Sequence, residues 1–228
     1  MYYVQKKYLI TPKILCVIVI FLCTIGCSTM PVIDVPYKPK ITIQIQDQNE
    51  SLGKWRLHVL PVKDSRMIPE KVQLKIKDID PRRVIGWWGE MMPRTSVFLI
   101  KRPFTEVFYD ALIYEMKNAG YSVIKELASD TMEGQSIFNL ECILKYAHAT
   151  SLVGMEVETW AGIKLSYRIT DSSGAVIHNG YLEEKTINKE GLISSPEAIG
   201  DALINMCLPQ LIEKLIKDVD VAINNRPL

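Results

Sequence analysis

The chain has 228 residues, of which 27 are basic and 26 are acidic, so its formal charge near neutral pH is +1. Proteins that bind nucleic acid usually carry a basic patch and a high isoelectric point, so this balance argues against a nucleic-acid partner. A chain of this length suits one domain, which can bury its own hydrophobic core.

The N-terminal segment combines positive charge with an apolar run. Three lysines and no acidic residue precede an uncharged stretch of twelve residues, ILCVIVIFLCTI, that begins at Ile14. A bilayer core needs about 20 residues, so the run is too short to cross it and matches a secretory signal instead. Two alternatives stay open: a buried element of the domain, and an uncleaved anchor from Tyr8 to about Ile33 in which Lys13 snorkels.

The apolar run ends in Gly26-Cys27-Ser28. This resembles the lipobox of bacterial lipoproteins, in which a small residue precedes the cysteine that becomes acylated. Cys23, the other candidate, follows the bulky Leu22. The resemblance implies that residues 1–26 are removed, that Cys27 is the lipidated residue, and that Ser28 directs the protein to the outer membrane, facing the periplasm. Two or more acyl chains hold a protein stably on a membrane.

The residues after the cysteine contain three prolines between Ser28 and Lys40 and predict an extended tether rather than a packed element. The expected division is a signal peptide at 1–26, a lipidated N-terminus and tether at 27–40, and a single periplasmic domain at 41–228. Residues 27–228 keep 24 basic and 26 acidic side chains, a formal charge of −2.

Two cysteines remain beyond Cys27, namely Cys142 and Cys207. They could pair in an oxidising periplasm. Cys142, however, alternates with apolar neighbours, which is typical of a buried free thiol.

The first half of the domain predicts strands and one long loop. Residues 41–47 and 55–62 alternate apolar and polar side chains, as half-buried strands do. Residues 63–94 contain prolines and mixed charge and are expected to be an irregular loop, with a short strand at 95–100.

A helix follows, because Phe104, Phe108, Leu112 and Met116 recur every four residues. Gly120 is placed to end it in a left-handed cap.

Strands return at 121–124, 137–148 and 157–171, where apolar residues again alternate with polar ones. A turn at 171–174 leads into a paired strand at 175–187.

The last helix is expected to begin with Ser195 as its cap and Pro196 in its first turn. Pro209 predicts a kink or two abutting helices. The predicted fold class is α+β, a largely antiparallel β-sheet with two main amphipathic helices packed on one face.

The sequence carries no catalytic or metal-binding motif of a familiar kind. Its three histidines form no H-E-x-x-H or Cys/His cluster, and G-x-S-x-G, P-loop and G-x-G-x-x-G patterns are absent. We therefore expect no enzyme activity, no metal and no cofactor. His58 and His178 are interpreted as ordinary, hydrogen-bonded strand residues.

Two stretches are candidates for polar or aromatic contacts. Asp64-Ser65-Arg66 is interpreted as a turn in which Asp64 binds backbone amides and Arg66 pairs locally, with a polar contact point as the alternative.

The stretch IGWWGEMMPR, residues 85–94, is the candidate interaction site, because tryptophan, arginine and methionine favour contact surfaces. The residues are Trp87, Trp88, Met91, Met92 and Arg94. The alternative is that the tryptophans fold back onto the sheet edge. If this stretch is a contact loop, replacing both tryptophans by alanine should leave folding largely intact.

The order of elements resembles the YajG-type family of bacterial lipoproteins and, more loosely, the auxiliary lipoproteins of envelope ABC transporters. The residues that carry the resemblance are Asp64 and Arg66, Ile85 and Gly86, Gly120, Tyr121 and Val123, and Asp218 and Asp220. The resemblance implies an anchored periplasmic domain with no established catalytic activity.

The expected function is that of a non-enzymatic, lipid-anchored envelope lipoprotein with a periplasmic binding or interaction domain. It would be anchored in the membrane through the lipidated Cys27 and would contact an envelope protein. The alternative is an accessory lipoprotein of an envelope transporter that binds a lipid or small ligand, for which a deep apolar pocket would be expected.

Overall fold

The structure is a computed structural model that describes residues 30–40, 55–88, 96–125, 136–153, 157–190 and 195–224. The strand predicted at 41–47 and the residues Cys27, Met91, Met92 and Arg94 lie outside the described residues.

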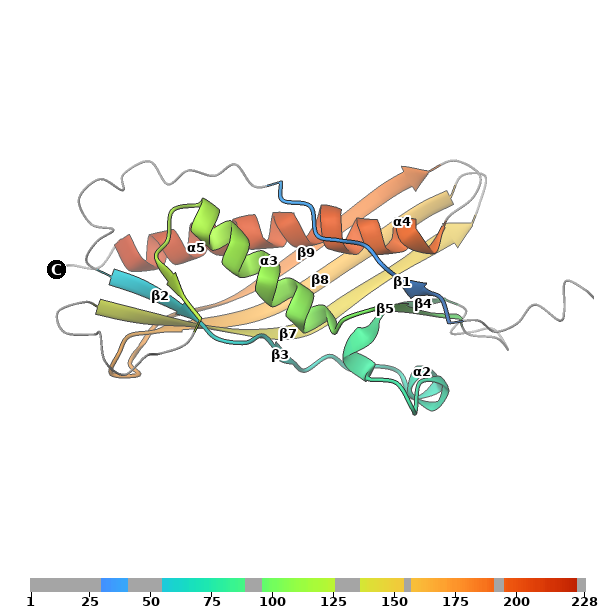
Figure 1. Cartoon of the computed structure of the whole chain (residues 1–228), viewed down its shortest axis with the longest axis horizontal. Coiled ribbons are helices and arrows are strands. Elements are labelled where there is room, and N and C mark those ends of the chain that lie inside the picture. The colour runs from blue at the N-terminus through green and yellow to red at the C-terminus, as the bar shows by residue number, and fades with distance from the viewer. Residues whose placement is uncertain are drawn as a thin grey trace, which may run out of the picture.

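The centre of the molecule is an open, mixed sheet of six strands (Figure 1). Its long strands β7 (Ser136–Val153), β8 (Val157–Thr170) and β9 (Val176–Glu190) are antiparallel neighbours, as predicted.

The other half of this sheet is parallel. The strand β2 (Trp55–Val59) pairs in parallel with both β7 and β6 (Val123–Ile124), and β3 (Lys63–Asp64) extends the pairing along β7. The sheet is therefore antiparallel only across its long strands.

A second, smaller sheet has the strand order β1-β5-β4. It consists of β1 (Val32–Ile33), β5 (Ser96–Ile100) and β4 (Val84–Trp88). It lies against the C-terminal half of β7, and a Cβ atom at Gly86 would stand only 1.9 Å from the Ala149 carbonyl oxygen. Only a glycine permits this approach, which explains the Ile85-Gly86 step in the sequence.

The prediction of an irregular loop at residues 63–94 is wrong for residues 63–88, which the structure describes. Residues 63–88 form β3, the helix α2 (Glu70–Lys75), the 3-10 turn η1 (Pro81–Arg83) and β4. The helix was missed because it buries only Val72, with Ile76 just beyond its end, and two apolar positions give no visible stripe.

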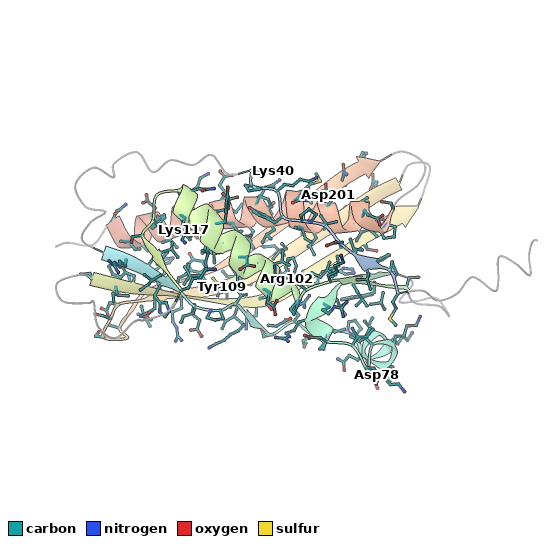
Figure 2. All side chains as sticks on the ribbon, in the orientation of Figure 1. Lys40, Asp78, Arg102, Tyr109, Lys117 and Asp201 are labelled. Carbon is teal, nitrogen blue, oxygen red and sulfur yellow. The ribbon has the colours of Figure 1, made fainter. Side chains whose placement is uncertain are left out.

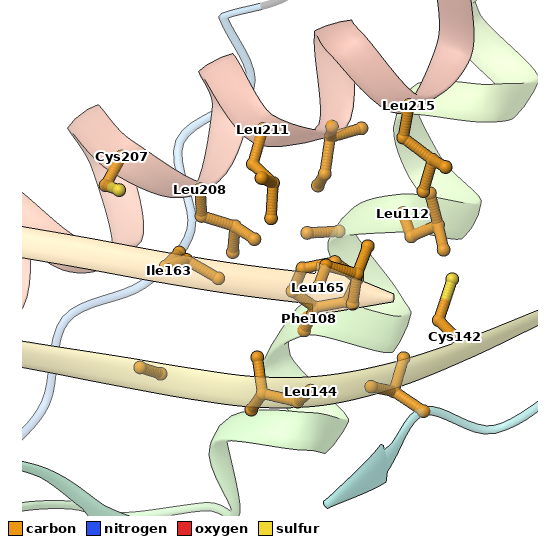
Figure 3. Packing of buried hydrophobic residues seen from close by; sticks show 14 of the residues in the cluster. Phe108, Leu112, Cys142, Leu144, Ile163, Leu165, Cys207, Leu208, Leu211 and Leu215 are labelled. Carbon is orange, nitrogen blue, oxygen red and sulfur yellow. The ribbon is translucent and has the colours of Figure 1, made fainter. Parts of the chain in front are cut away.

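Helices cover one face of the six-stranded sheet. They are α3 (Phe104–Asn118), α4 (Pro196–Asp201), the π-helical segment η2 (Ala202–Cys207) and α5 (Leu208–Asn224). Figure 3 shows Phe108 and Leu112 of α3 in one cluster with Leu211 and Leu215 of α5 and sheet residues such as Leu165. This arrangement confirms the predicted α+β class.

The predicted helix ends are confirmed. Gly120 has φ 98° and donates to the Lys117 carbonyl oxygen, while the Tyr121 N–H reaches the Met116 carbonyl oxygen at 3.0 Å. This pair of bonds is a Schellman cap. At the other helix, the Ser195 hydroxyl oxygen accepts from the Ala198 N–H at 3.1 Å.

Pro209 marks a change in helix geometry, as its position predicted. It has no N–H to donate to the preceding turn, and the π-helical segment η2 stands directly before α5. The helix itself continues from α4 through η2 into α5, because Ala202 and Leu208 at the two junctions have α-helical backbone angles, so the irregularity is a π-helical stretch and not two abutting helices.

Candidate functional site

Residues 30–40 pack onto the domain, which contradicts the prediction of a free tether for this stretch. Ile33 is buried in the main core, and Val35 packs against that core. A Cβ atom at Gly200 would stand 2.8 Å from Ile33 Cγ2 and 3.0 Å from Val35 Cγ2, so the glycine makes room for the segment. The prolines keep the chain extended, as expected, but Ile33 between them is buried and Val35 and Tyr37 are partly buried, whereas Val32 is exposed.

Asn205 fixes the segment through its side-chain amide. Its Oδ1 accepts from the Lys38 N–H at 2.7 Å, and its Nδ2 donates to the Pro36 carbonyl oxygen at 3.2 Å and to Asp201 Oδ1 at 2.8 Å. Because Asn205 is almost wholly buried, these bonds replace those that water would otherwise supply.

A second polar contact joins the segment to α3. The Tyr37 hydroxyl donates to Glu115 Oε1 at 2.7 Å, and Glu115 is fully buried. Burial, followed by the hydrogen bond to Glu115, raises the pKa of Tyr37 well above its ordinary value. The tyrosine therefore keeps its proton throughout the neutral range.

The segment and α3 enclose a half-open pocket of about 400 Å³, here called the segment pocket. Its wall includes the apolar residues Ile33, Val35, Val107, Ala111 and Ile204. Its charged lining residues form two ion pairs, Lys101 with Asp34 and Arg102 with Asp110. Figure 2 labels Arg102 at the start of α3. Pockets that take small ligands are of this size and apolar character.

The face of the large sheet that carries Trp160 and Lys164 is opposite to the buried residues of β8 and bears exposed aromatic side chains. Tyr146, Trp160, Tyr181 and Ile187 are all among the exposed large hydrophobic residues. Trp160 is the cross-strand partner of Ile187, and Lys164 pairs with Glu183 at 3.4 Å nearby. We call this surface the outer sheet face.

Trp87, from the predicted contact stretch, lies in β4 and is half-buried. Its ring stacks on His148 with a centroid distance of 4.1 Å, and its backbone N–H donates to His148 Nε2 at 3.2 Å. It also packs against the small core that contains Val72 and Leu99. Trp87 thus folds back onto the sheet, whereas the side chain of Trp88 is not among those described.

Asp64 and Arg66 form a structural turn, which confirms the local interpretation. Asp64 Oδ1 accepts from the Arg66 N–H at 3.1 Å, and the guanidinium donates to both carboxylate oxygens. The same guanidinium also donates to the Val84 carbonyl oxygen at 2.7 Å. Arg66 therefore ties β3 to β4, a role that the sequence did not reveal.

Asp218 and Asp220 of α5 accept hydrogen bonds from two tyrosines of the domain. The Tyr167 hydroxyl donates to Asp218 Oδ2 at 2.7 Å and lies 3.1 Å from His178 Nε2, while the Tyr121 hydroxyl lies 3.4 Å from Asp220 Oδ1. Burial is the main cause that raises the pKa of Tyr167, so its phenol stays protonated. The cluster joins α5 to the sheet and supplies no activated nucleophile.

The remaining candidates are also satisfied structurally. His58 Nδ1 lies 2.9 Å from Asn139 Oδ1, as a hydrogen-bonded strand histidine should. Cys142 and Cys207 are both buried and free, so they do not pair. Within the described ranges, no three His, Cys, Asp or Glu side chains are placed to hold a metal ion. In the same ranges, no helix has the length and apolar character needed to cross a membrane.

Comparison with known proteins relates this chain to others through its fold. No family model matches the sequence, and no curated protein matches it. A Xanthomonas campestris protein of the DUF330 family has a similar structure, with a TM-score of 0.53, 13% identity, and coverage of 83% of this chain and 97% of that one. A minor lipoprotein from Acinetobacter baumannii matches with a TM-score of 0.39, 11% identity, and coverage of 76% and 97%. The first likeness establishes a shared fold.

Proposed function

We propose that this chain is a lipid-anchored protein of the bacterial outer membrane whose periplasmic domain binds another envelope component without catalysing a reaction. One observation carries the proposal. Cys27 of the lipobox-like stretch lies three residues before Met30, which packs against the small core. The apolar run that resembles a signal peptide therefore lies, in the sequence, just before a segment that is packed on the domain. The further proposal that the chain is related to the YajG-type lipoproteins rests on the order of the motifs along the sequence.

The test is the mass of the processed chain. The full chain and a Cys27→Ala variant are expressed in a Gram-negative host, and intact masses are taken from the membrane fraction. We expect residues 27–228 plus acyl groups for the wild type and an unprocessed variant. A wild-type chain that keeps residues 1–26 contradicts the proposal and indicates an uncleaved anchor. A Ser28→Asp variant should move from the outer to the inner membrane.

The outer sheet face supports the binding role, because aromatic residues are favoured at protein contacts. A photo-reactive amino acid at Trp160 or Tyr181 should crosslink to an envelope protein in cells. The same group at Val221, which is exposed on α5, is the control. Equal crosslinking from the face and the control would show that the face has no dedicated partner.

The segment pocket favours a second candidate, an accessory lipoprotein that binds a lipid or small ligand. Native mass spectrometry of the purified protein should then detect a co-purified apolar molecule. Val107→Trp, which fills the pocket wall, should abolish that signal, whereas Val221→Trp should not. A signal that survives Val107→Trp would place the ligand elsewhere.

A further inference from the structure

Two large apolar side chains are exposed on α2 and in the chain just before it. Val72 and Ile76 are buried in the small core, while Leu74, halfway between them, is 68% exposed and Met67 is 89% exposed. In a helix of 3.6 residues per turn, a residue two positions from each buried neighbour points to the opposite side. We call this surface, from Met67 to Lys77, the α2 edge.

The α2 edge lies in a basic part of an otherwise acidic chain. Residues 63–83 contain seven basic and four acidic side chains, a formal charge of +3, whereas residues 27–228 together carry −2. Lys71 and Lys77 are exposed beside Leu74. A basic surface with exposed apolar residues at its centre is complementary to anionic lipid headgroups.

Chain length places this edge close to the anchor. Met30 packs against the small core to which Val72 and Ile76 belong. Three residues of fully extended chain span at most about 11 Å, which limits the distance from Cys27 to Met30. The headgroup layer on one side of a bilayer is about 5–8 Å thick. An acylated Cys27 thus leaves no room for a wide gap between this end of the domain and the headgroups.

We propose that the α2 edge lies on an anionic phospholipid surface, with Met67 and Leu74 inserted among the headgroups. The inference rests on the proposed acylation of Cys27. It gives the domain a fixed orientation, in which α2 faces the membrane and the distant C-terminal end of α5 faces away from it (Figure 1). Figure 2 labels Asp78 at this edge of the molecule.

The experiment uses the full-length, processed protein in vesicles of phosphatidylethanolamine and phosphatidylglycerol. A fluorophore is attached to Leu74→Cys or, as the matched control, to Val221→Cys, which is 58% exposed in the wild type. The native thiols Cys142 and Cys207 are buried and leave the introduced thiol as the site of labelling. Quenching is measured with a spin-labelled lipid and with aqueous iodide.

We expect the Leu74 label to be quenched by the lipid and to be shielded from iodide at least threefold relative to the Val221 label. Lys71→Glu with Lys77→Glu should reduce the lipid quenching, while Lys117→Glu on α3 should not. Equal quenching at both labels in protein whose mass shows acylation overturns the inference and leaves the anchor in place. A label shielded equally in detergent indicates a protein contact and also overturns it. A mass without acyl groups overturns both proposals.

Discussion

The Tyr37 hydroxyl donates a hydrogen bond of 2.7 Å to Glu115 Oε1, across 78 positions of sequence. Glu115 is fully buried, and its second oxygen, Oε2, has no hydrogen-bond partner within the described residues. A buried polar group without a partner is costly, so this single bond offsets much of the cost of the carboxyl group. Tyr37 also lines the segment pocket.

Tyr37→Phe should therefore lower the free energy of unfolding by about 1–3 kcal/mol, because it leaves both Glu115 oxygens unsatisfied. Urea unfolding measures the change, with Tyr114→Phe on the exposed side of α3 as the control. Adding Glu115→Met to Tyr37→Phe should recover part of the loss, because both polar partners are then absent. If Tyr37→Phe is as stable as the control, the bond does not hold the segment.

The buried tyrosines predict a loss of stability in alkali. Burial, the largest cause in each case, raises the pKa values of Tyr37, Tyr121 and Tyr167 above the ordinary value of 10.0. A group whose pKa is raised by folding stabilises the fold fully below its unfolded pKa and loses this contribution as pH rises toward its folded pKa. Melting temperature should thus fall above about pH 10. The variant Tyr167→Phe should show a shallower fall than the wild type, and an unchanged slope would contradict the assignment.

The two free thiols should be unreactive in the folded protein. Burial raises the pKa of Cys207 to about 12 and raises the pKa of Cys142 as well. Because the thiolate is the reactive form, alkylation by iodoacetamide at pH 8 should be at least about 100-fold slower than in urea. Mass spectrometry of peptides would report each thiol separately. Rapid native labelling at Cys207 alone would indicate local opening between η2 and β9, where its Sγ meets the Glu184 carbonyl oxygen at 3.4 Å.

Local patterns allowed the long elements to be predicted, because their signals lie within each element. The four-residue spacing from Phe104 to Met116 and the alternation along β7 and β8 depend only on burial of one face. Gly120 and Ser195 likewise act within a few residues of their positions. These features need no knowledge of distant partners.

The packing of residues 30–40 could not be predicted in this way. It depends on Asn205 and Glu115, which lie 167 positions from Lys38 and 78 positions from Tyr37. The parallel pairing of β2 with β7 is equally non-local. From sequence alone, a proline-rich segment is predicted to be a tether unless the surface on which it packs is known. The segment pocket likewise exists only when residues 30–40 lie against the rest of the domain.

Trp87→Ala should destabilise the protein, in contrast to the expectation from sequence that replacing both tryptophans by alanine leaves folding largely intact. The ring stacks on His148 and packs on the small core, so its loss should lower the free energy of unfolding by about 2 kcal/mol. Trp87→Phe, which keeps an aromatic ring, should recover most of the loss. Chemical unfolding of the two variants checks this, and a stable Trp87→Ala variant would return Trp87 to the candidate contact residues.

Gly86→Ala tests how closely β4 approaches β7. Its Cβ would lie 1.9 Å from the backbone oxygen of Ala149, and a backbone atom cannot move aside without shifting a strand. The substitution should therefore cost about 3 kcal/mol or more. Gly162→Ala is the matched control, because its Cβ would stand 3.3 Å from the ring carbon Cε1 of Tyr146, a side chain that can move. Equal stability of the two variants would mean that the small sheet is not held against β7. The position of the α2 edge, which packs on this small sheet, would then no longer be fixed.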